Sequence, residues 1–273
     1  MKSLIRLFRP LNCFLASVSV PVILITLHGT DTGIWPHWST TFLGMAVVFA
    51  FTAGGNTLND YIDRDVDRIN HPRRPIPSKE ISPRQALMVS GAMFVISFAA
   101  SLLLDDLLPK VIVIVAIAMM ISYELGLKKR GLSGNITISA LTGFLFLFAG
   151  SVYGDIALPS ILAFLAALST LGREIAKDIQ DMVGDFDRHT LPMKIGKKRS
   201  RMVAAICVIL AVSLSPLPYV LSMLPLSYLL IVLIADIIFI YSVVLLNEPR
   251  RAQHFIKAAM GVALLAFLIG GII

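Results

Sequence analysis

Two segments of the chain carry acidic residues at the same spacing. They are NDYIDRDVD, with Asp60, Asp63 and Asp67, and DIQDMVGD, with Asp178, Asp181 and Asp185. In an α-helix, positions i, i+3 and i+7 fall within an arc of roughly 60°, so each triplet is expected to line one helical face. Asn56 and Glu174, four positions before each triplet, fall on the same arc. Crowded carboxylates repel one another unless a cation neutralises them.

The chemistry that this pattern favours is the binding of divalent cations together with a polyanion. Mg²⁺ prefers oxygen ligands and is usually held by one or two carboxylates, while substrate phosphates and water complete its shell. Two acidic faces that meet could therefore clamp one diphosphate through two ions. Nearby basic residues would neutralise the remaining charge of the diphosphate: Arg73, Arg74, Lys128 and Lys177. One such motif alone is more typical of a solvated helix, but a second copy favours a catalytic site.

The composition is that of a membrane protein. Hydrophobic residues make up 56% of the chain and charged residues 15%, with a mean hydropathy of +0.81. An all-α, multi-pass bundle is therefore expected. About nine apolar segments are long enough to span a bilayer, at roughly 10–27, 41–57, 86–104, 110–127, 132–152, 156–172, 202–219, 226–246 and 255–273.

The basic residues predict the orientation of these spans. If nine helices alternate from a cytoplasmic N-terminus, every Lys and Arg except Lys110 falls in a segment on the inner side. Such asymmetry is what the positive-inside rule demands, and one helix more or fewer would destroy it. The net charge of +7 is thus explained by topology and anion binding, and no nucleic-acid partner is expected. We expect a multi-pass protein of the cell membrane with its active site on the cytoplasmic side.

The two acidic segments also indicate an internal duplication. When Asp60 is aligned with Asp178, His71 aligns with His189 as well. Each motif ends a span and opens a long inner loop, and three spans separate the two helices, so both acidic faces should meet at one side of the membrane. We expect one domain, residues 1–273, in which inner loops at about 58–85 and 173–201 cap the site. The two histidines are interpreted as turn residues.

One acidic residue lies outside both motifs. Asp236 occupies the middle of the apolar segment LIADIIFIYS. A charged Asp at mid-span costs about 2.5–3.5 kcal/mol on insertion scales, so its side chain should face the bundle interior and have a partner. The sequence leaves open whether Asp236 only ties helices together or belongs to a substrate site.

Taken together, the motifs resemble those of a known family. The string Asn59 to Asp67, followed by RPIPS, is similar to the first aspartate-rich motif of the UbiA-type intramembrane prenyltransferases, and DIQDMVGD followed by TLP is similar to the second. The segment Arg9-Pro10-Leu11-Asn12 resembles the entry of the family's first helix, and Tyr123 with Lys128 resembles a Tyr-to-Lys element after the fourth. Lys79 stands where the family often has glycine, which affects only the local turn.

This resemblance implies a nine-helix bundle around a central cavity and Mg²⁺-dependent transfer of a polyprenyl group from its diphosphate. It implies that Asn59, Asp63 and Asp67 bind one Mg²⁺ and that Asp178, Asp181 and Asp185 bind the other. Asp60 is a further metal-binding candidate, and Asp63, Asp67, Asp181 and Asp185 are the candidate catalytic residues. The candidates for binding the diphosphate are Arg9, Asn12, Arg74, Tyr123, Lys128 and Lys177.

The acceptor is expected to be a lipid. The sequences of both motifs are most similar to those of the archaeal lipid branch of the family. This similarity implies that geranylgeranyl diphosphate alkylates the free hydroxyl of geranylgeranylglyceryl phosphate. Prenylation of an aromatic acceptor for a quinone-type pathway is the alternative. From another class, a cation or metabolite transporter is also conceivable, but transporter sites usually lie near the membrane midplane, whereas these motifs belong at helix ends.

Overall fold

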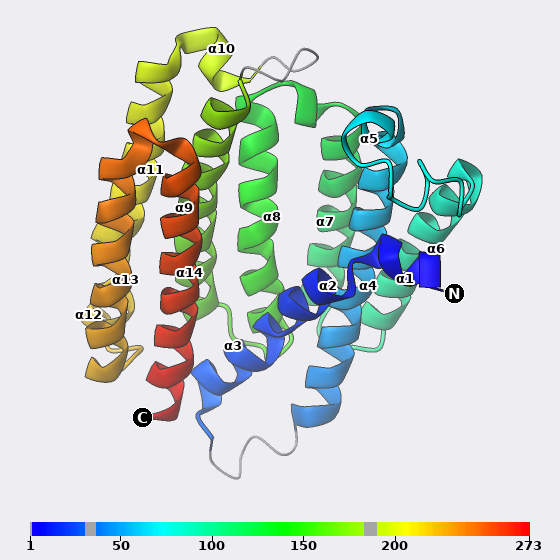
Figure 1. Ribbon diagram of the computed structural model, residues 1–273. Coiled ribbons are helices and arrows are strands. Elements are labelled where there is room, and N and C mark those ends of the chain that lie inside the picture. The colour runs from blue at the N-terminus through cyan, green and yellow to red at the C-terminus, as the bar shows by residue number, and fades with distance from the viewer. Residues whose placement is uncertain (1, 31–36, 183–189) are drawn as a thin grey trace.

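The computed structural model describes residues 2–30, 37–182 and 190–273 (Figure 1). All regular elements in these ranges are helices: α1 (Lys2–Phe8), α2 (Pro10–Ser17), α3 (Ser19–His28), α4 (Trp38–Ile62), α5 (Arg64–Asn70), α6 (Pro83–Ser101), α7 (Leu107–Leu125), η2 (Leu127–Lys129), α8 (Leu132–Ser151), α9 (Ala157–Asp181), α10 (Leu191–Ile195), α11 (Lys197–Leu214), α12 (Leu217–Val220), α13 (Leu226–Val244), η3 (Leu245–Asn247) and α14 (Pro249–Ile272).

Within the described residues, nine helical stretches are long and apolar enough to cross a membrane, which confirms the predicted all-α bundle. They are Pro10–His28, Trp38–Ile62, Pro83–Ser101, Leu107–Leu125, Leu132–Ser151, Ala157–Asp181, Lys197–Val220, Leu226–Asn247 and Pro249–Ile272. The second and sixth run further than predicted, to residues 62 and 181 rather than 57 and 172. The reason is that helical hydrogen bonding continues into the polar motifs after the apolar run has ended. Parts of both acidic motifs therefore belong to the spanning helices themselves.

The first span is preceded by a sharp break between α1 and α2. Pro10 has no backbone N–H, and the residue before a proline avoids the right-handed helical region. Arg9 adopts the left-handed conformation, with φ 52° and ψ 67°. The interruption leaves the carbonyl oxygen of Phe8 without a helical donor, and the side-chain amide of Asn56 from α4 donates to it at 2.8 Å. Asn56 thus anchors the helix break instead of extending the acidic face.

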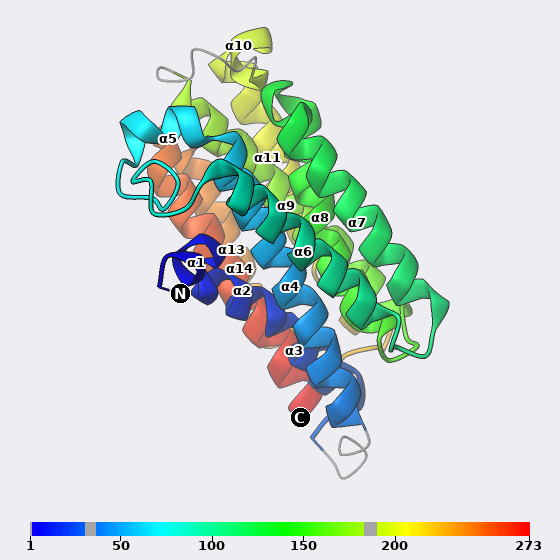
Figure 2. The same cartoon turned by 90° about the vertical axis from the view of Figure 1, so that its right-hand side faces the viewer.

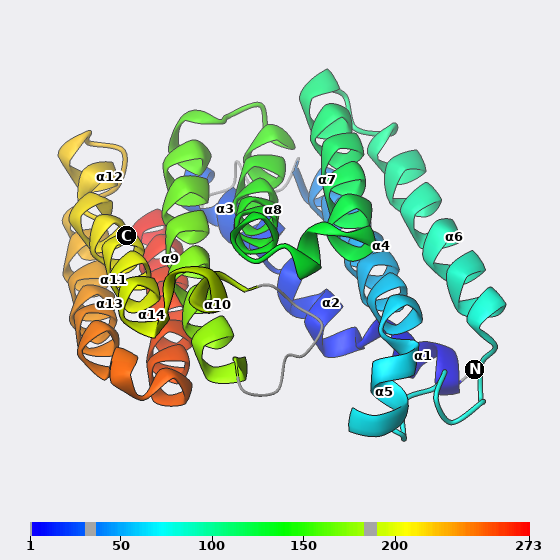
Figure 3. The same ribbon diagram turned by 90° about the horizontal axis from the view of Figure 1, so that it is seen from above.

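The spans form two groups joined by α8. Seen from above, α9, α11, α13 and α14 lie on one side and α4, α6 and α7 on the other, with α8 between them (Figure 3). Small residues permit close packing where α8 meets α9. A Cβ added to Gly143 of α8 would lie 2.8 Å from the carbonyl oxygen of Ala163 in α9. The backbones of these two helices therefore approach each other directly.

The helices that carry the acidic motifs end at the same end of the bundle. The short helices that follow them in the chain, α5 and α10, both lie at that end (Figures 1 and 2). Large apolar side chains on the lateral surface are exposed, among them Leu233, Ile237 and Ile240 of α13. Such a surface would be unfavourable in water and suits contact with lipid. The chain is a multi-pass membrane protein with its polar motifs gathered at one end.

Candidate active site

The first acidic motif does not lie on one continuous helix. α4 ends at Ile62, Asp63 has non-helical dihedral angles (φ −82°, ψ 3°), and α5 begins at Arg64. The prediction that Asn56, Asp60, Asp63 and Asp67 line one helical face is therefore wrong. The backbone N–H of Asp67 still donates to the carbonyl oxygen of Asp63 at 2.8 Å, but the acidic residues are divided between two sets of partners.

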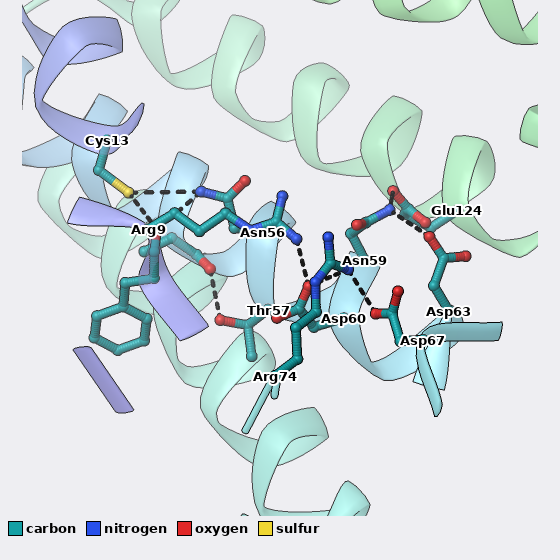
Figure 4. A network of polar contacts seen from close by, with 12 residues as sticks. Arg9, Cys13, Asn56, Thr57, Asn59, Asp60, Asp63, Asp67, Arg74 and Glu124 are labelled. Atoms are coloured by element: carbon teal, nitrogen blue, oxygen red, sulfur yellow. Dashed lines mark hydrogen bonds and ion pairs between the residues drawn. The ribbon is translucent and has the colours of Figure 1, made fainter. Parts of the chain in front are cut away.

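Asp60 and Asp67 form the first set, together with two arginines. Asp60 is 2% exposed and forms ion pairs with Arg9 and with Arg74, the latter at 3.2 Å. Arg74 also lies 2.5 Å from Asp67, whose side chain is buried as well. Figure 4 shows both guanidinium groups directed toward Asp60. Arg74 thus bridges the two ends of the interrupted helix and neutralises both carboxylates.

Asp63 and Asn59 form the second set and meet α7. The ammonium group of Lys128, which lies in η2 directly after α7, is 2.6 Å from Asp63 and 3.2 Å from Glu124. The side-chain amide of Asn59 donates to Glu124 at 3.0 Å and to Asp63 at 3.2 Å. The Asp63 side chain is 25% exposed, whereas that of Glu124 is only 3% exposed. Asp63 is thus the more accessible of the two carboxylates.

The second acidic motif keeps the predicted helical geometry. Glu174, Asp178 and Asp181 all belong to α9, which runs without interruption to Asp181. Asp178 accepts a hydrogen bond from the side-chain amide of Asn135, at the start of α8, at 2.8 Å. Lys177 is exposed, and its ammonium group lies 3.8 Å from Glu174. Asp185 and His189 lie outside the described residues.

The remaining predicted residues differ in their exposure. Tyr123 is half-buried in the last turn of α7, one residue before Glu124. Asn12 is exposed in α2, and its backbone N–H donates to the carbonyl oxygen of Arg9 at 2.8 Å. His71 is exposed and ends α5, as expected of a turn residue.

Two residues of this network were not identified from the sequence, Glu124 and Asn135. Glu124 precedes Lys128 by four positions, the spacing of a helical Glu–Lys pair. A carboxylate at the end of an apolar span also indicates a residue that needs a polar partner. Asn135 follows Gly131 at the polar start of a span. Neither pattern predicts the distant partner, because Asn59 is 65 positions from Glu124 and Asp178 is 43 positions from Asn135.

The oxygen ligands at this end of the bundle suit a hard divalent cation. Asn59, Asp63 and Asp67 offer amide and carboxylate oxygens on one side, and Asp178 and Asp181 offer carboxylates on the other. No group of three or more His, Cys, Asp or Glu side chains within the described residues converges closely enough to hold a metal alone. Mg²⁺ commonly completes its shell with water and substrate phosphate rather than with an all-protein cage. The residues therefore fit Mg²⁺ bound together with a diphosphate.

An apolar pocket suits the hydrocarbon part of such a substrate. It lies between α2, α4, α7 and α8 and is lined almost entirely by apolar side chains, including Phe51, Met120, Phe144 and Phe148. The α4 and α7 helices that line this pocket also carry Asn59 and Glu124 at their ends. A long isoprenoid chain that entered the pocket would therefore leave its polar end near the acidic motifs.

Asp236 lies away from this site, in the core of the C-terminal group of helices. It is 5% exposed, and the hydroxyl of Ser215 donates to its carboxyl group at 2.6 Å. The hydroxyl of Tyr228 donates to the carbonyl oxygen of Ser215, also at 2.6 Å. The prediction that Asp236 faces the bundle interior with a partner is confirmed. Its contacts tie α13 to the end of α11.

Comparisons with known proteins extend over the whole chain. The sequence profile described as the UbiA prenyltransferase family matches residues 19–268. A digeranylgeranylglyceryl phosphate synthase of Methanosphaera stadtmanae is 39% identical over 280 residues, which covers 100% of both chains.

Solved structures show the same architecture. One, described as giving insights into digeranylgeranylglyceryl phosphate synthase in membranes, is 35% identical and has a TM-score of 0.87, covering 99% of this chain and 98% of that chain. A UbiA homolog from Archaeoglobus fulgidus, bound to GPP and Mg²⁺, has a TM-score of 0.70 at 18% identity and covers 98% of both chains. At that identity the likeness shows the fold alone.

Proposed function

This chain belongs to the UbiA prenyltransferase family and is a membrane-embedded prenyltransferase, and from that premise we propose that it makes an ether lipid. The donor is geranylgeranyl diphosphate, the acceptor is the free hydroxyl of geranylgeranylglyceryl phosphate, and diphosphate is released. The lipid acceptor is supported most directly by the full-length relative named digeranylgeranylglyceryl phosphate synthase, at 39% identity. Family membership also argues against the transporter alternative.

The donor diphosphate is proposed to lie between the two acidic motifs. Asn59, Asp63 and Asp67 would hold one Mg²⁺, and Asp178 and Asp181 would hold the second together with Asp185. When bound, Mg²⁺ supplies Lewis-acid neutralisation of the charge that grows on the departing diphosphate. The placement is supported by the ends of both motif-bearing helices, which lie at one end of the bundle and supply oxygen ligands there.

The chain's own cations contribute to the same charge stabilisation. Lys128 and Arg74 now pair with the carboxylates Asp63 and Asp67. A diphosphate that entered beside them would give both cations a new anionic partner. Heterolysis of the allylic C–O bond sends the electron pair to the diphosphate oxygen and leaves a delocalised carbocation. Fixed positive groups stabilise the first product, and the apolar pocket keeps water from the second.

The new ether bond then forms between the acceptor hydroxyl and the allylic carbon. The hydroxyl oxygen supplies the electron pair and loses its proton as the C–O bond forms. The released diphosphate keeps the electron pair of the broken bond, and the proton of the hydroxyl passes to that diphosphate or to water, so the overall change is one C–O bond exchanged for another. We propose that the N-terminus and the active site face the cytoplasm, which the distribution of Lys and Arg supports.

A competition experiment tests the acceptor. Purified protein in detergent receives geranylgeranyl diphosphate and Mg²⁺ with equal concentrations of geranylgeranylglyceryl phosphate and 4-hydroxybenzoate, and the products are identified by mass spectrometry. We expect the doubly alkylated glycerol phosphate and no reaction when EDTA replaces Mg²⁺. A prenylated aromatic product would support the alternative acceptor instead, and turnover that persists in EDTA would contradict the role of a divalent cation.

A further inference from the structure

A polar pocket, separate from the apolar one, opens beside the first acidic motif, on the side of α4 that faces α1 and α2. Four arginines line it, Arg6, Arg9, Arg73 and Arg74, together with Asp60 and His71. Lys128 and Glu124 do not line this pocket, because they contact the other side of the α4 end, at Asn59 and Asp63. Figure 4 shows Arg9 and Arg74 on the Asp60 side, separate from the cluster around Glu124.

The charges in this pocket are unevenly neutralised. Arg9 and Arg74 share Asp60, and Arg74 also pairs with Asp67. Arg6 lies 2.8 Å from Glu80. Arg73 is exposed, and in the described part of the chain its guanidinium has no carboxylate within ion-pairing distance. Among the described residues, the guanidinium of Arg73 is therefore a cation of this pocket that no carboxylate neutralises.

The loop that carries Arg73 is held in place. The guanidinium of Arg6 donates to the carbonyl oxygen of Arg73, and the backbone N–H of Arg74 donates to the carbonyl oxygen of His71 at 2.9 Å. Hydrogen bonds from Ser3, Ser78 and Arg6 keep the pKa of Glu80 below its ordinary value, so Glu80 stays ionised and holds Arg6. The loop is thus fixed before any ligand arrives, which lowers the entropic cost of binding an anion.

The backbone of Arg9, at the wall of this pocket, has a strained conformation. Arg9 is one of three non-glycine residues with positive φ among the described residues. A left-handed conformation in such a residue is costly, and it persists only where the surrounding contacts determine it. Here the ion pair to Asp60 holds Arg9 at the pocket wall. The guanidinium of Arg9 and the backbone carbonyl group of Arg73 are therefore both held in place at the same opening.

We propose that this pocket binds the phosphate monoester of the acceptor lipid, an inference that rests on the proposed function. Guanidinium groups bind phosphate through paired hydrogen bonds. Asp60, the carboxylate that lines the pocket, is already paired with Arg9 and Arg74, so the pocket suits an anion bound without a metal, in contrast to the donor diphosphate. Beside it, α2 exposes Leu11, Phe14 and Leu15, which offer an apolar path for the isoprenoid chain of an amphiphile.

The test is the variant Arg73→Gln, assayed in a phospholipid-free detergent so that no bilayer headgroup competes. Losing a charged hydrogen bond is worth about 1.5 kcal/mol, so KM for geranylgeranylglyceryl phosphate should rise about tenfold. KM for geranylgeranyl diphosphate should equal that of the unmodified protein. With a dephosphorylated acceptor, geranylgeranylglycerol, the two proteins should have the same KM, because the phosphate is missing. Arg73→Lys should restore part of the preference for the phosphorylated acceptor.

The matched control is Arg68→Gln, which removes an exposed arginine of α5 that pairs with Asp65 at 3.3 Å and lies outside the pocket. Its KM values should stay unchanged. If Arg73→Gln raises KM for the donor, or leaves both KM values unchanged, the pocket does not hold the acceptor phosphate although the proposed reaction stands. If the unmodified protein does not use the phosphorylated acceptor at all, the proposed reaction fails and the assignment of the pocket fails with it. Anionic phospholipid is then added to both proteins. If it inhibits the unmodified protein and Arg73→Gln equally, bilayer headgroups do not occupy the pocket.

Discussion

Asp60 and Asp63 are three positions apart, yet their surroundings give them different tasks. Asp60 is buried between Arg9 and Arg74, and its carboxylate forms ion pairs with both guanidinium groups. Asp63 is partly exposed beside Lys128 and can reach a ligand from the open end of the bundle. We therefore interpret Asp60 as the anchor of the basic residues and Asp63 as the metal-binding residue.

Alanine substitutions separate these two tasks. Asp63→Ala is expected to reduce prenyl transfer to background, with little loss of thermal stability, because Lys128 keeps its contact with Glu124 at 3.2 Å. Asp60→Ala should lower the free energy of unfolding by about 3 kcal/mol, because it leaves the guanidinium of Arg9 without its buried carboxylate, while Arg74 keeps its ion pair with Asp67. Activity and thermal unfolding in detergent are measured on both variants. Near-normal transfer by Asp63→Ala would contradict its role in metal binding.

At the scale of elements, the site depends on where helices stop and how closely they pack. Asp60 of α4 and Asp67 of α5 meet at Arg74 across the interruption at Asp63. The long α9 brings Asp178 to the start of α8, where Asn135 holds it. The spacing between α8 and α9 therefore sets the position of the second motif, and glycine at position 143 permits that spacing.

Two glycine substitutions test this packing. Gly143→Ala would place Cβ 2.8 Å from the carbonyl oxygen of Ala163, so α8 and α9 must separate. Overpacking of this kind typically costs about 1–3 kcal/mol, and the apparent melting temperature in detergent should fall. The control is Gly261→Ala in α14, where the added Cβ meets no atom within 4 Å. Alanine favours helix there, so stability should stay equal or rise. Equal melting temperatures for both variants would contradict the close contact.

At the scale of the whole molecule, the topology brings two distant motifs to one end of an apolar bundle. Charge and hydrophobicity are separated along the membrane normal, with the basic loops gathered beside the acidic motifs. The apolar pocket between α2, α4, α7 and α8 opens the interior to a hydrocarbon chain.

The proposed cytoplasmic orientation of the N-terminus rests on this charge separation and can be measured. A cysteine introduced at Lys79, in the loop between α5 and α6, should react with a membrane-impermeant maleimide only after the cells are opened. A cysteine at Asp105, in the loop between α6 and α7, should react in intact cells. Cys13 and Cys207 are both buried and give little background. The reverse labelling pattern would show that the active site faces outward.

The sequence by itself determined the features that depend on local periodicity. Nine apolar segments, their alternation with basic loops and the two acidic motifs at span ends could all be predicted, since hydrophobicity and length decide which segments enter a membrane. The break at Pro10 could also have been anticipated, because proline cannot donate the hydrogen bond that a continuing helix needs.

Only the tertiary structure decided which charged groups meet. Helical periodicity placed Asp60, Asp63 and Asp67 on one face, but in the structure Asp60 and Asp67 pair with Arg74, whereas Asp63 pairs with Lys128. Glu124 became part of the site because packing of α7 against α4 brings it to Asn59. Pairings of this kind join positions far apart in the chain. They are set by helix packing and by the cost of burying an unneutralised charge, which no local pattern encodes.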